Sequence, residues 1–289
     1  MSLLQGNVSR ILTFSCVDGP GNRLVIFLQG CNFSCRTCHN PHTIGICNHC
    51  GDCIGVCPEK ALSMNDQGKV VWDAATCTQC DKCLESCPES SSPKTRRYTV
   101  DDIVRIVREN RYFLSGITVS GGEATIQLPF VIELFKSIKN DAELQHLSCF
   151  LDSNGFLSEK GWVRILPYLD GVMVDLKAWR NENHQWLTGK SNHRVFRSIQ
   201  YLAAHRKLHE VRIIYVPEFQ DMDENIDSLA GLIRELPEAT NIRLNAFATH
   251  GVTGDAKKWQ PCSREQLNAF ADRLGERGVT RLTKAAVFQ

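Results

Sequence analysis

The distribution of apolar residues along the chain predicts an α/β fold with a mainly parallel sheet. Short runs rich in Val, Ile and Leu alternate with longer segments in which apolar residues recur every three or four positions, as in successive βα units. The first run covers residues 23–29. The other predicted strands cover residues 116–120, 147–152, 171–176, 211–216, 241–246 and 279–288, and the predicted helices cover residues 100–110, 128–140, 158–166, 192–207, 223–236 and 263–277. Because six or seven repeats fall short of the eight of a closed barrel, we expect a partial (β/α)6-type barrel.

Residues 43–95 interrupt this alternation. The segment has few apolar runs, contains eight Cys, and carries 4 Lys against 7 Asp and Glu, which makes it acidic. We therefore predict two parts. Residues 1–42 and 96–289 form the barrel, and residues 43–95 form a cysteine-rich insertion.

Composition and charge exclude several classes of protein. A chain of 289 residues, 43% of them hydrophobic, can bury a large core without disulfides. Its 33 Lys and Arg against 32 Asp and Glu give a formal net charge of +1, which supplies no long-range field for nucleic acid or an anionic membrane. The longest apolar run, residues 24–28, is far too short to span a membrane, and the first 20 residues lack the pattern of a signal peptide. We expect a cytoplasmic protein that binds neither nucleic acid nor membranes.

Cysteine spacing supplies the first chemical motif. Eleven of the 14 Cys fall between Cys31 and Cys87, and Cys31, Cys35 and Cys38 form a C-x3-C-x2-C loop just after the first predicted strand. Three thiolates leave one iron of a [4Fe–4S] cluster open to another ligand. The alternative is a zinc site that takes its fourth ligand from His39 or Cys16.

Two further cysteine runs lie in the insertion, and each has the spacing C-x2-C-x2-C-x3-C-P of bacterial two-cluster ferredoxins. In that pattern the fourth Cys of each run binds the other cluster. One cluster would then take Cys47, Cys50, Cys53 and Cys87, and the other would take Cys77, Cys80, Cys83 and Cys57. Zinc ribbons are the alternative.

Small and charged residues follow three of the predicted strands. Gly121, Gly122 and Glu123 come directly after residues 116–120, Asp152 and Ser153 end the next strand, and Asp175 and Lys177 end the one after. The carboxyl ends of parallel strands meet at one end of a barrel, so we expect these groups to converge there. Ordinary turns and helix caps would also explain these residue types.

Together these motifs resemble the radical S-adenosylmethionine (SAM) enzymes, which carry a C-x3-C-x2-C loop after the first strand. The flanking sequences Val17-Asp-Gly-Pro-Gly21, Gln29-Gly-Cys31 and Cys38-His-Asn-Pro41 are similar to those of the glycyl-radical-enzyme activating enzymes. The resemblance covers essentially the whole chain. It is greatest to the YjjW subgroup, which shares the Phe-Ser-Cys-Val-Asp-Gly-Pro-Gly opening, the insertion and the Arg-Leu-Asn-Ala-Phe segment.

The resemblance implies an activity. In the family, SAM binds the open iron, one electron cleaves its C5′–S bond, and the resulting 5′-deoxyadenosyl radical takes a hydrogen atom from a glycine Cα of a partner enzyme. It implies three [4Fe–4S] clusters, SAM, a monovalent cation held by two aspartates, a flavodoxin or ferredoxin as reductant, and a YjjI-like glycyl radical enzyme as partner.

The resemblance also implies roles for single residues. The catalytic set is Cys31, Cys35, Cys38, Lys177 and Arg212. The SAM-binding set is Gly121, Gly122, Glu123, Asp152, Ser153, Asp175, Lys177 and His250, where His250 is the candidate for a family histidine found in a different local sequence. Asp18 and His39 correspond to residues beside the incoming glycine loop.

Two other functions remain open from the sequence. A radical SAM enzyme can act on a small molecule, and a protein with three cysteine motifs can be an electron carrier in which every cluster is fully ligated. The role of the insertion is equally open, because its clusters could relay electrons or its surface could serve to dock the partner.

Overall fold

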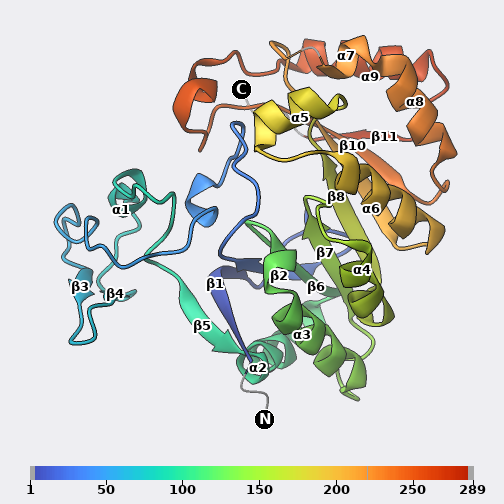
Figure 1. Cartoon of the computed structure of the whole chain (residues 1–289). Coiled ribbons are helices and arrows are strands. Elements are labelled where there is room, and N and C mark those ends of the chain that lie inside the picture. The colour runs from blue at the N-terminus through green and yellow to red at the C-terminus, as the bar shows by residue number, and fades with distance from the viewer. Residues whose placement is uncertain (1–3, 220, 286–289) are drawn as a thin grey trace.

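The computed structural model describes residues 4–219 and 221–285. Within these residues, one large sheet of nine strands runs through the molecule (Figure 1). The strands lie in the order β11, β10, β9, β8, β7, β6, β2, β1, β5. Their bounds are β1 Gln5–Leu12, β2 Arg23–Leu28, β5 Arg96–Thr99, β6 Gly116–Gly121, β7 Ser148–Ser153, β8 Gly171–Leu176, β9 Leu208–Tyr215, β10 Asn241–Ala246 and β11 Leu282–Lys284.

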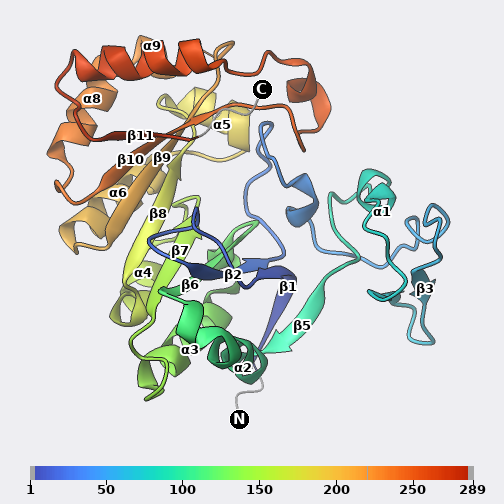
Figure 2. The ribbon, with the colours of Figure 1, turned by 180° about the vertical axis from the view of Figure 1, so that it is seen from behind.

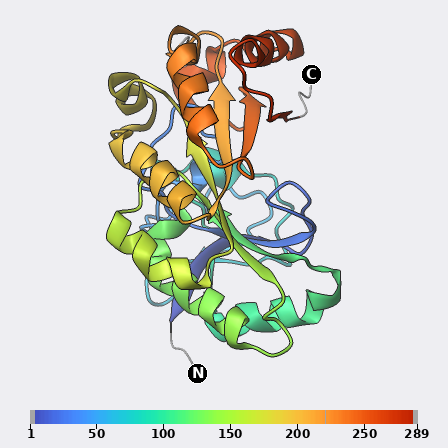
Figure 3. The ribbon, with the colours of Figure 1, turned by 90° about the vertical axis from the view of Figure 1, so that its right-hand side faces the viewer.

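Strands β2, β6, β7, β8, β9, β10 and β11 pair in parallel, as the alternating pattern predicts. Helices connect them, and in Figure 3 the lime and yellow helices lie along one side of the strands. The helix bounds are α2 Val100–Asn110, α3 Leu128–Asn140, α4 Glu159–Ile165, α5 Asn181–Thr188, α6 His193–Ala204, α7 Asp221–Glu224, α8 Ile226–Glu235 and α9 Arg264–Gly275. The chain is therefore an α/β protein with a mainly parallel sheet.

Helix α2 illustrates how the sequence sets an element. Thr99 and Asp102 form a capping box, in which each side chain accepts a hydrogen bond from the other residue's main-chain N–H. The buried residues of the helix recur at helical spacing and pack against the sheet; they are Val100, Ile103, Val104 and Val107.

Several predicted elements need correction. The expected helix 223–236 starts earlier and divides into α7 and α8, because the Asn225 side chain donates a hydrogen bond to the carbonyl of Asp221. The expected strand 211–216 begins three residues earlier, at Leu208. The last strand, expected at 279–288, is only Leu282–Lys284 in β11, and residues 286–289 lie outside the described residues.

Two strands and one helix of the described residues outside 43–95 were not predicted. Strands β1 and β5 extend the sheet in antiparallel fashion beyond β2, and helix α5 lies between β8 and α6. The α5 sequence is too polar to show a helical repeat, and the Asp221 carboxylate stabilises its start by accepting a hydrogen bond from the Arg180 main-chain N–H.

The insertion lies to one side of the sheet in both Figure 1 and Figure 2. It contains the hairpin of β3 (Leu62–Met64) and β4 (Val70–Trp72) and the short helix α1 (Lys82–Glu85). Its buried residues form a small core separate from that of the sheet, made of Cys53, Leu62, Val70 and Cys83. None of the helices in the described parts of the chain is long and apolar enough to cross a membrane.

Candidate active site

A cavity of about 790 Å³ opens at the carboxyl ends of the parallel strands. All the candidate residues for catalysis, SAM or the glycine loop that lie outside residues 43–95 line this one cavity. They are Asp18, Cys31, Cys35, Cys38, His39, Gly121, Gly122, Glu123, Asp152, Ser153, Asp175, Lys177, Arg212 and His250. The fold thus brings together groups that are up to 232 residues apart in the sequence.

The loop that carries the first three cysteines is held on two sides. The Cys31 N–H donates to the carbonyl of Ile44 at 2.9 Å, and the Ser34 and Arg36 N–H groups donate to carbonyls at the end of α5. Burial raises the pKa of the Cys31 thiol to about 12 and that of Cys35 to about 11. Such thiols stay protonated at neutral pH unless a metal displaces their protons, as metal ligation does.

Gly121 and Gly122 allow two main-chain segments to pack in close contact. A Cβ on Gly121 would lie 2.1 Å from the Leu28 carbonyl oxygen, and one on Gly122 would lie 2.2 Å from that of Gly30. Gly121 also has a φ of +124°, which a side chain would disfavour. The two glycines therefore let the end of β6 pack against the end of β2, and they also expose main chain to the cavity.

Glu123 is almost fully buried, and its carboxylate accepts four hydrogen bonds. The donors are the N–H and hydroxyl of Thr125, the hydroxyl of Ser153, and the N–H of Asn154 at 2.7 Å. Burial raises the pKa of Glu123, while these bonds act in the opposite direction. The side chain thereby fixes the β7 loop next to the paired glycines.

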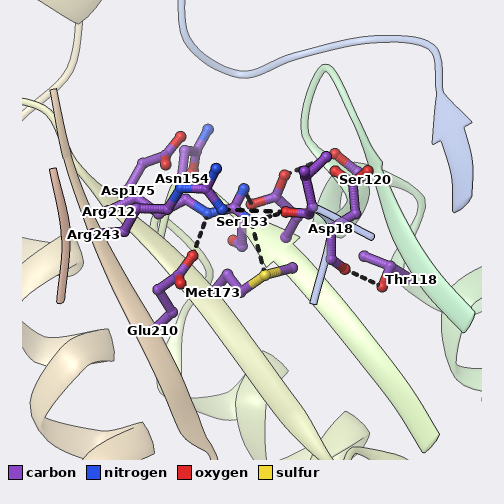
Figure 4. Close-up of polar contacts among 12 residues, drawn as sticks. Asp18, Thr118, Ser120, Ser153, Asn154, Met173, Asp175, Glu210, Arg212 and Arg243 are labelled. Atoms are coloured by element: carbon purple, nitrogen blue, oxygen red, sulfur yellow. Dashed lines mark hydrogen bonds and ion pairs between the residues drawn. The ribbon is translucent and has the colours of Figure 1, made fainter. Parts of the chain in front are cut away.

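Arg212 lies at the centre of the charged wall of the cavity, as Figure 4 shows. Its guanidinium donates to Asp152 at 3.1 Å and to Glu210 at 2.7 Å, and it contacts the sulfur of Met173 at 2.9 Å. Burial opposes its charge, but Asp152 and the neighbouring acids outweigh burial and raise the pKa of Arg212 above its usual range. Burial also raises the pKa of Asp152, despite the guanidinium.

A second ion pair lies beside the cysteine loop. The Lys177 ammonium is 2.9 Å from an Asp175 carboxylate oxygen. Burial disfavours the ammonium charge, but Asp175 and Cys35 outweigh it and raise the pKa of Lys177. Lys177 therefore carries a positive charge at neutral pH beside the cysteine loop.

The remaining predicted residues lie at the rim. The carbonyl of Asp18 accepts a hydrogen bond from the Thr118 hydroxyl at 2.6 Å (Figure 4). His39 and His250 are both exposed. His39 and the segment after β10 are in close contact, since a Cβ on Gly251 would lie 2.3 Å from the His39 carbonyl oxygen.

Sequence reasoning missed several side chains that complete the site. Ser120 donates to Asp152 at 2.9 Å, and Met173 and Glu210 contact Arg212. The spacing along the strands could have indicated two of them. Met173 lies two positions before Asp175 on β8, and Glu210 lies two positions before Arg212 on β9, so each pair points to the same face. Cys262 is buried and also lines the cavity.

The insertion brings cysteines of both runs together. A small pocket is lined by Cys47, Cys50 and Cys53 of the first run and by Cys87 of the second, which is the crossed set that the spacing predicts. The other set is Cys57, Cys77, Cys80 and Cys83, of which Cys83 and Cys57 pack in the small core. Across residues 4–219 and 221–285, no three Cys, His, Asp or Glu side chains converge closely enough to hold a single metal ion. The cluster assignments therefore stay predictions.

Comparison with known proteins gives a consistent result. Residues 25–230 match the model of the radical SAM superfamily. The isethionate sulfite-lyase activating enzyme of Oleidesulfovibrio alaskensis is 31% identical over 252 residues, which cover 80% of each chain. The pyruvate formate-lyase 1-activating enzyme of Escherichia coli is 30% identical over 246 residues, covering 82% of this chain and 80% of that protein.

Among solved structures, QueE from Escherichia coli aligns over 98% of this chain and 95% of its own, with a TM-score of 0.53 and 16% identity, a likeness of fold alone. The family match covers well over half of the residues, and two activating enzymes are at least 30% identical over four fifths of the chain. The chain therefore belongs to the radical SAM superfamily and, within it, to the family of glycyl-radical-enzyme activating enzymes.

Proposed function

We propose that this protein uses SAM to place a radical on a glycine of a partner glycyl radical enzyme. The observation that carries the proposal is that the three-cysteine loop and the predicted SAM-binding residues face one cavity. The donor set fits the cofactors, because three thiols offer a cluster three ligands and leave one iron for SAM. When bound, cluster and SAM supply one chemical step: one electron breaks the C5′–S bond, giving methionine and a 5′-deoxyadenosyl radical that takes a hydrogen atom from the glycine Cα.

In this proposal the protein's own residues bind SAM and orient it. Main chain at Gly121 and Gly122, kept in position by the Glu123 hydrogen bonds, holds the amino group of SAM. Asp152, Ser153 and Asp175 contact SAM, and the two aspartates hold a monovalent cation beside it. The positive charges of Lys177 and Arg212 balance the carboxylates of Asp175 and Asp152. Asp18, His39 and His250 lie at the rim, where a glycine loop would enter.

The partner we propose is a YjjI-like glycyl radical enzyme in the cytoplasm, with flavodoxin or ferredoxin as the reductant. This identity rests on the resemblance of the chain to the YjjW subgroup. The Phe-Ser-Cys-Val-Asp-Gly-Pro-Gly opening, the cysteine-rich insertion and the Arg-Leu-Asn-Ala-Phe segment carry that resemblance.

We propose further that residues 43–95 form a ferredoxin-like domain that relays electrons through two [4Fe–4S] clusters. A short path of hydrogen bonds supports this role. The Ser90 N–H donates to the Cys87 carbonyl, the Gly45 N–H donates to the Ser90 carbonyl at 2.9 Å, and the Cys31 N–H donates to the adjoining Ile44 carbonyl at 2.9 Å. Main chain thus connects a cysteine of the crossed set to a cysteine of the SAM loop.

Electron paramagnetic resonance tests the activity. Anaerobic protein with its clusters reconstituted is mixed with SAM, reduced flavodoxin and a purified YjjI-like enzyme, and we expect the doublet of a glycyl radical on the partner together with 5′-deoxyadenosine. The Cys35→Ala variant, which lacks one ligand of the SAM-binding cluster, is the control and should give neither product. Deoxyadenosine formed with a metabolite and no partner would instead favour a small-molecule enzyme.

A further inference from the structure

A buried hydroxyl in the insertion lacks a hydrogen-bond partner. Ser91 is 1% exposed, and its Oγ makes no hydrogen bond to any residue in the part of the chain that the structure describes. A buried hydroxyl left unpaired costs free energy, of the order of 1–3 kcal/mol, so such a group usually has a partner. The position of Ser91 therefore calls for an acceptor.

The same hydroxyl belongs to the pocket that the crossed cysteines line. Ser91 lines this pocket together with Cys47, Cys50, Cys53 and Cys87. The other wall residues are mostly apolar or small, including Val70 and Pro93. Iron-bound thiolate and sulfide sulfurs in this pocket would be the acceptors that the Ser91 hydroxyl lacks.

Ser92 provides an internal comparison. It lines the same pocket and is 4% exposed, but its Oγ already accepts a hydrogen bond from the Lys94 main-chain N–H at 3.1 Å. Two neighbouring serines of one pocket thus differ in whether their hydroxyl oxygen is engaged.

We infer that Ser91 donates a hydrogen bond to a sulfur of the iron–sulfur cluster ligated by Cys47, Cys50, Cys53 and Cys87, and that this bond raises the reduction potential of that cluster. The inference rests on the proposed function, since it requires a cluster in this pocket. Reduction adds one electron to the cluster and increases the negative charge on its sulfurs, so a donor stabilises the reduced form more than the oxidised form.

Because of the position of Ser91 in the insertion, this hydrogen bond would affect electron transfer toward the SAM-binding cluster. Ser91 directly follows Ser90, whose carbonyl accepts the hydrogen bond from Gly45 on the path toward Cys31. The electron from the reductant would therefore pass through the cluster that Ser91 adjusts. A loss of the hydroxyl changes how readily that cluster accepts the electron, without altering any cluster ligand.

A redox titration monitored by electron paramagnetic resonance tests the inference. The full-length chain carrying Cys31→Ala, Cys35→Ala and Cys38→Ala retains only the two insertion clusters, which simplifies the spectrum. In this background we expect Ser91→Ala to lower one of two midpoint potentials by about 59 mV, a tenfold change in the one-electron equilibrium. Ser92→Ala should leave both midpoints unchanged, and Ser91→Thr, which keeps a hydroxyl, should restore the shifted one.

A second readout detects the bond itself. After exchange into D₂O, electron–nuclear double resonance on the reduced protein should show a deuteron coupling that Ser91→Ala removes. Unchanged midpoints and couplings in Ser91→Ala, or equal shifts in Ser92→Ala, would overturn the inference while leaving the proposed function intact. If iron and sulfide analysis of this background finds no clusters, the relay proposal fails first, and the inference fails with it.

Discussion

Arg23 is among the largest side chains that the fold buries completely. Its guanidinium donates to main-chain carbonyls of Ile117 and Ser148 and to the hydroxyls of Ser148 and Thr118. The Thr118 hydroxyl in turn donates to the carbonyl of Asp18. Burial lowers the pKa of Arg23 to about 10, so it stays charged at neutral pH. One buried cation thus ties the start of β2 to β6, to β7 and to the loop that carries Asp18 into the cavity.

A conservative substitution tests this function of Arg23. Lysine has a single ammonium and cannot reach all the acceptors of a planar guanidinium. We expect Arg23→Lys to lower the free energy of unfolding by about 2–4 kcal/mol, because each buried acceptor left without a donor costs about 1–3 kcal/mol. Urea denaturation followed by circular dichroism measures this. Arg97→Lys on the exposed face of β5 is the control and should change it by less than about 0.5 kcal/mol; equal stability of the two variants would contradict the account.

At the scale of secondary structure, the barrel elements that carry buried apolar residues were predictable. Strands β8 and β10 and helices α2 and α3 have the bounds that the hydrophobic pattern gives. Elements stabilised by polar or long-range contacts were not predictable, since the start of α5 depends on Asp221, some 40 residues away, and β5 depends on pairing with β1. The site shows the same difference. Its lining residues could be predicted from sequence motifs, but the long-range hydrogen bonds of Glu123 could not.

Where the insertion joins the rest of the chain, its first and last segments are in close main-chain contact. A Cβ on Gly45 would lie 1.9 Å from the Glu89 carbonyl oxygen, and the Gly45 N–H donates to Ser90 at 2.9 Å. Gln29 reinforces this junction, because its side-chain amide donates to the carbonyls of His42 and Gly45 at 2.7 Å each. Only glycine fits at position 45.

We therefore expect Gly45→Ala to separate the insertion from the SAM loop while both parts stay folded. Hydrogen exchange should show faster exchange at residues 43–46 and 88–92. Reduction of the SAM-binding cluster by flavodoxin, followed by stopped-flow absorbance, should slow at least tenfold. Gly55→Ala is a matched control, since a Cβ there meets no atom within 4 Å. If Gly45→Ala and Gly55→Ala reduce the cluster at the same rate, the path through Gly45 is not used.

At the scale of the whole molecule, the cysteine-rich insertion and the cavity occupy separate regions. The insertion lies beside the sheet and has its own small core, whereas the cavity lies at the carboxyl ends of the parallel strands (Figures 1 and 2). The two regions meet where the Cys31 N–H donates to the Ile44 carbonyl and the Gln29 side chain donates to the Gly45 carbonyl. Under the proposed function, electrons would enter through the insertion, and Asp18, His39 and His250 of the cavity wall would be left to contact a protein loop.

The central claim is that a cluster on Cys31, Cys35 and Cys38 has an iron free to bind SAM. Electron–nuclear double resonance with SAM labelled with ¹⁷O in its carboxylate and ¹⁵N in its amino group tests it most directly. We predict couplings from both labels to the reduced cluster of the wild-type protein. The Cys31→Ala, Cys35→Ala, Cys38→Ala variant, which keeps the eight cysteines of the insertion, should show none. A wild-type spectrum that labelled SAM leaves unchanged, with iron analysis showing the cluster present, would contradict the account.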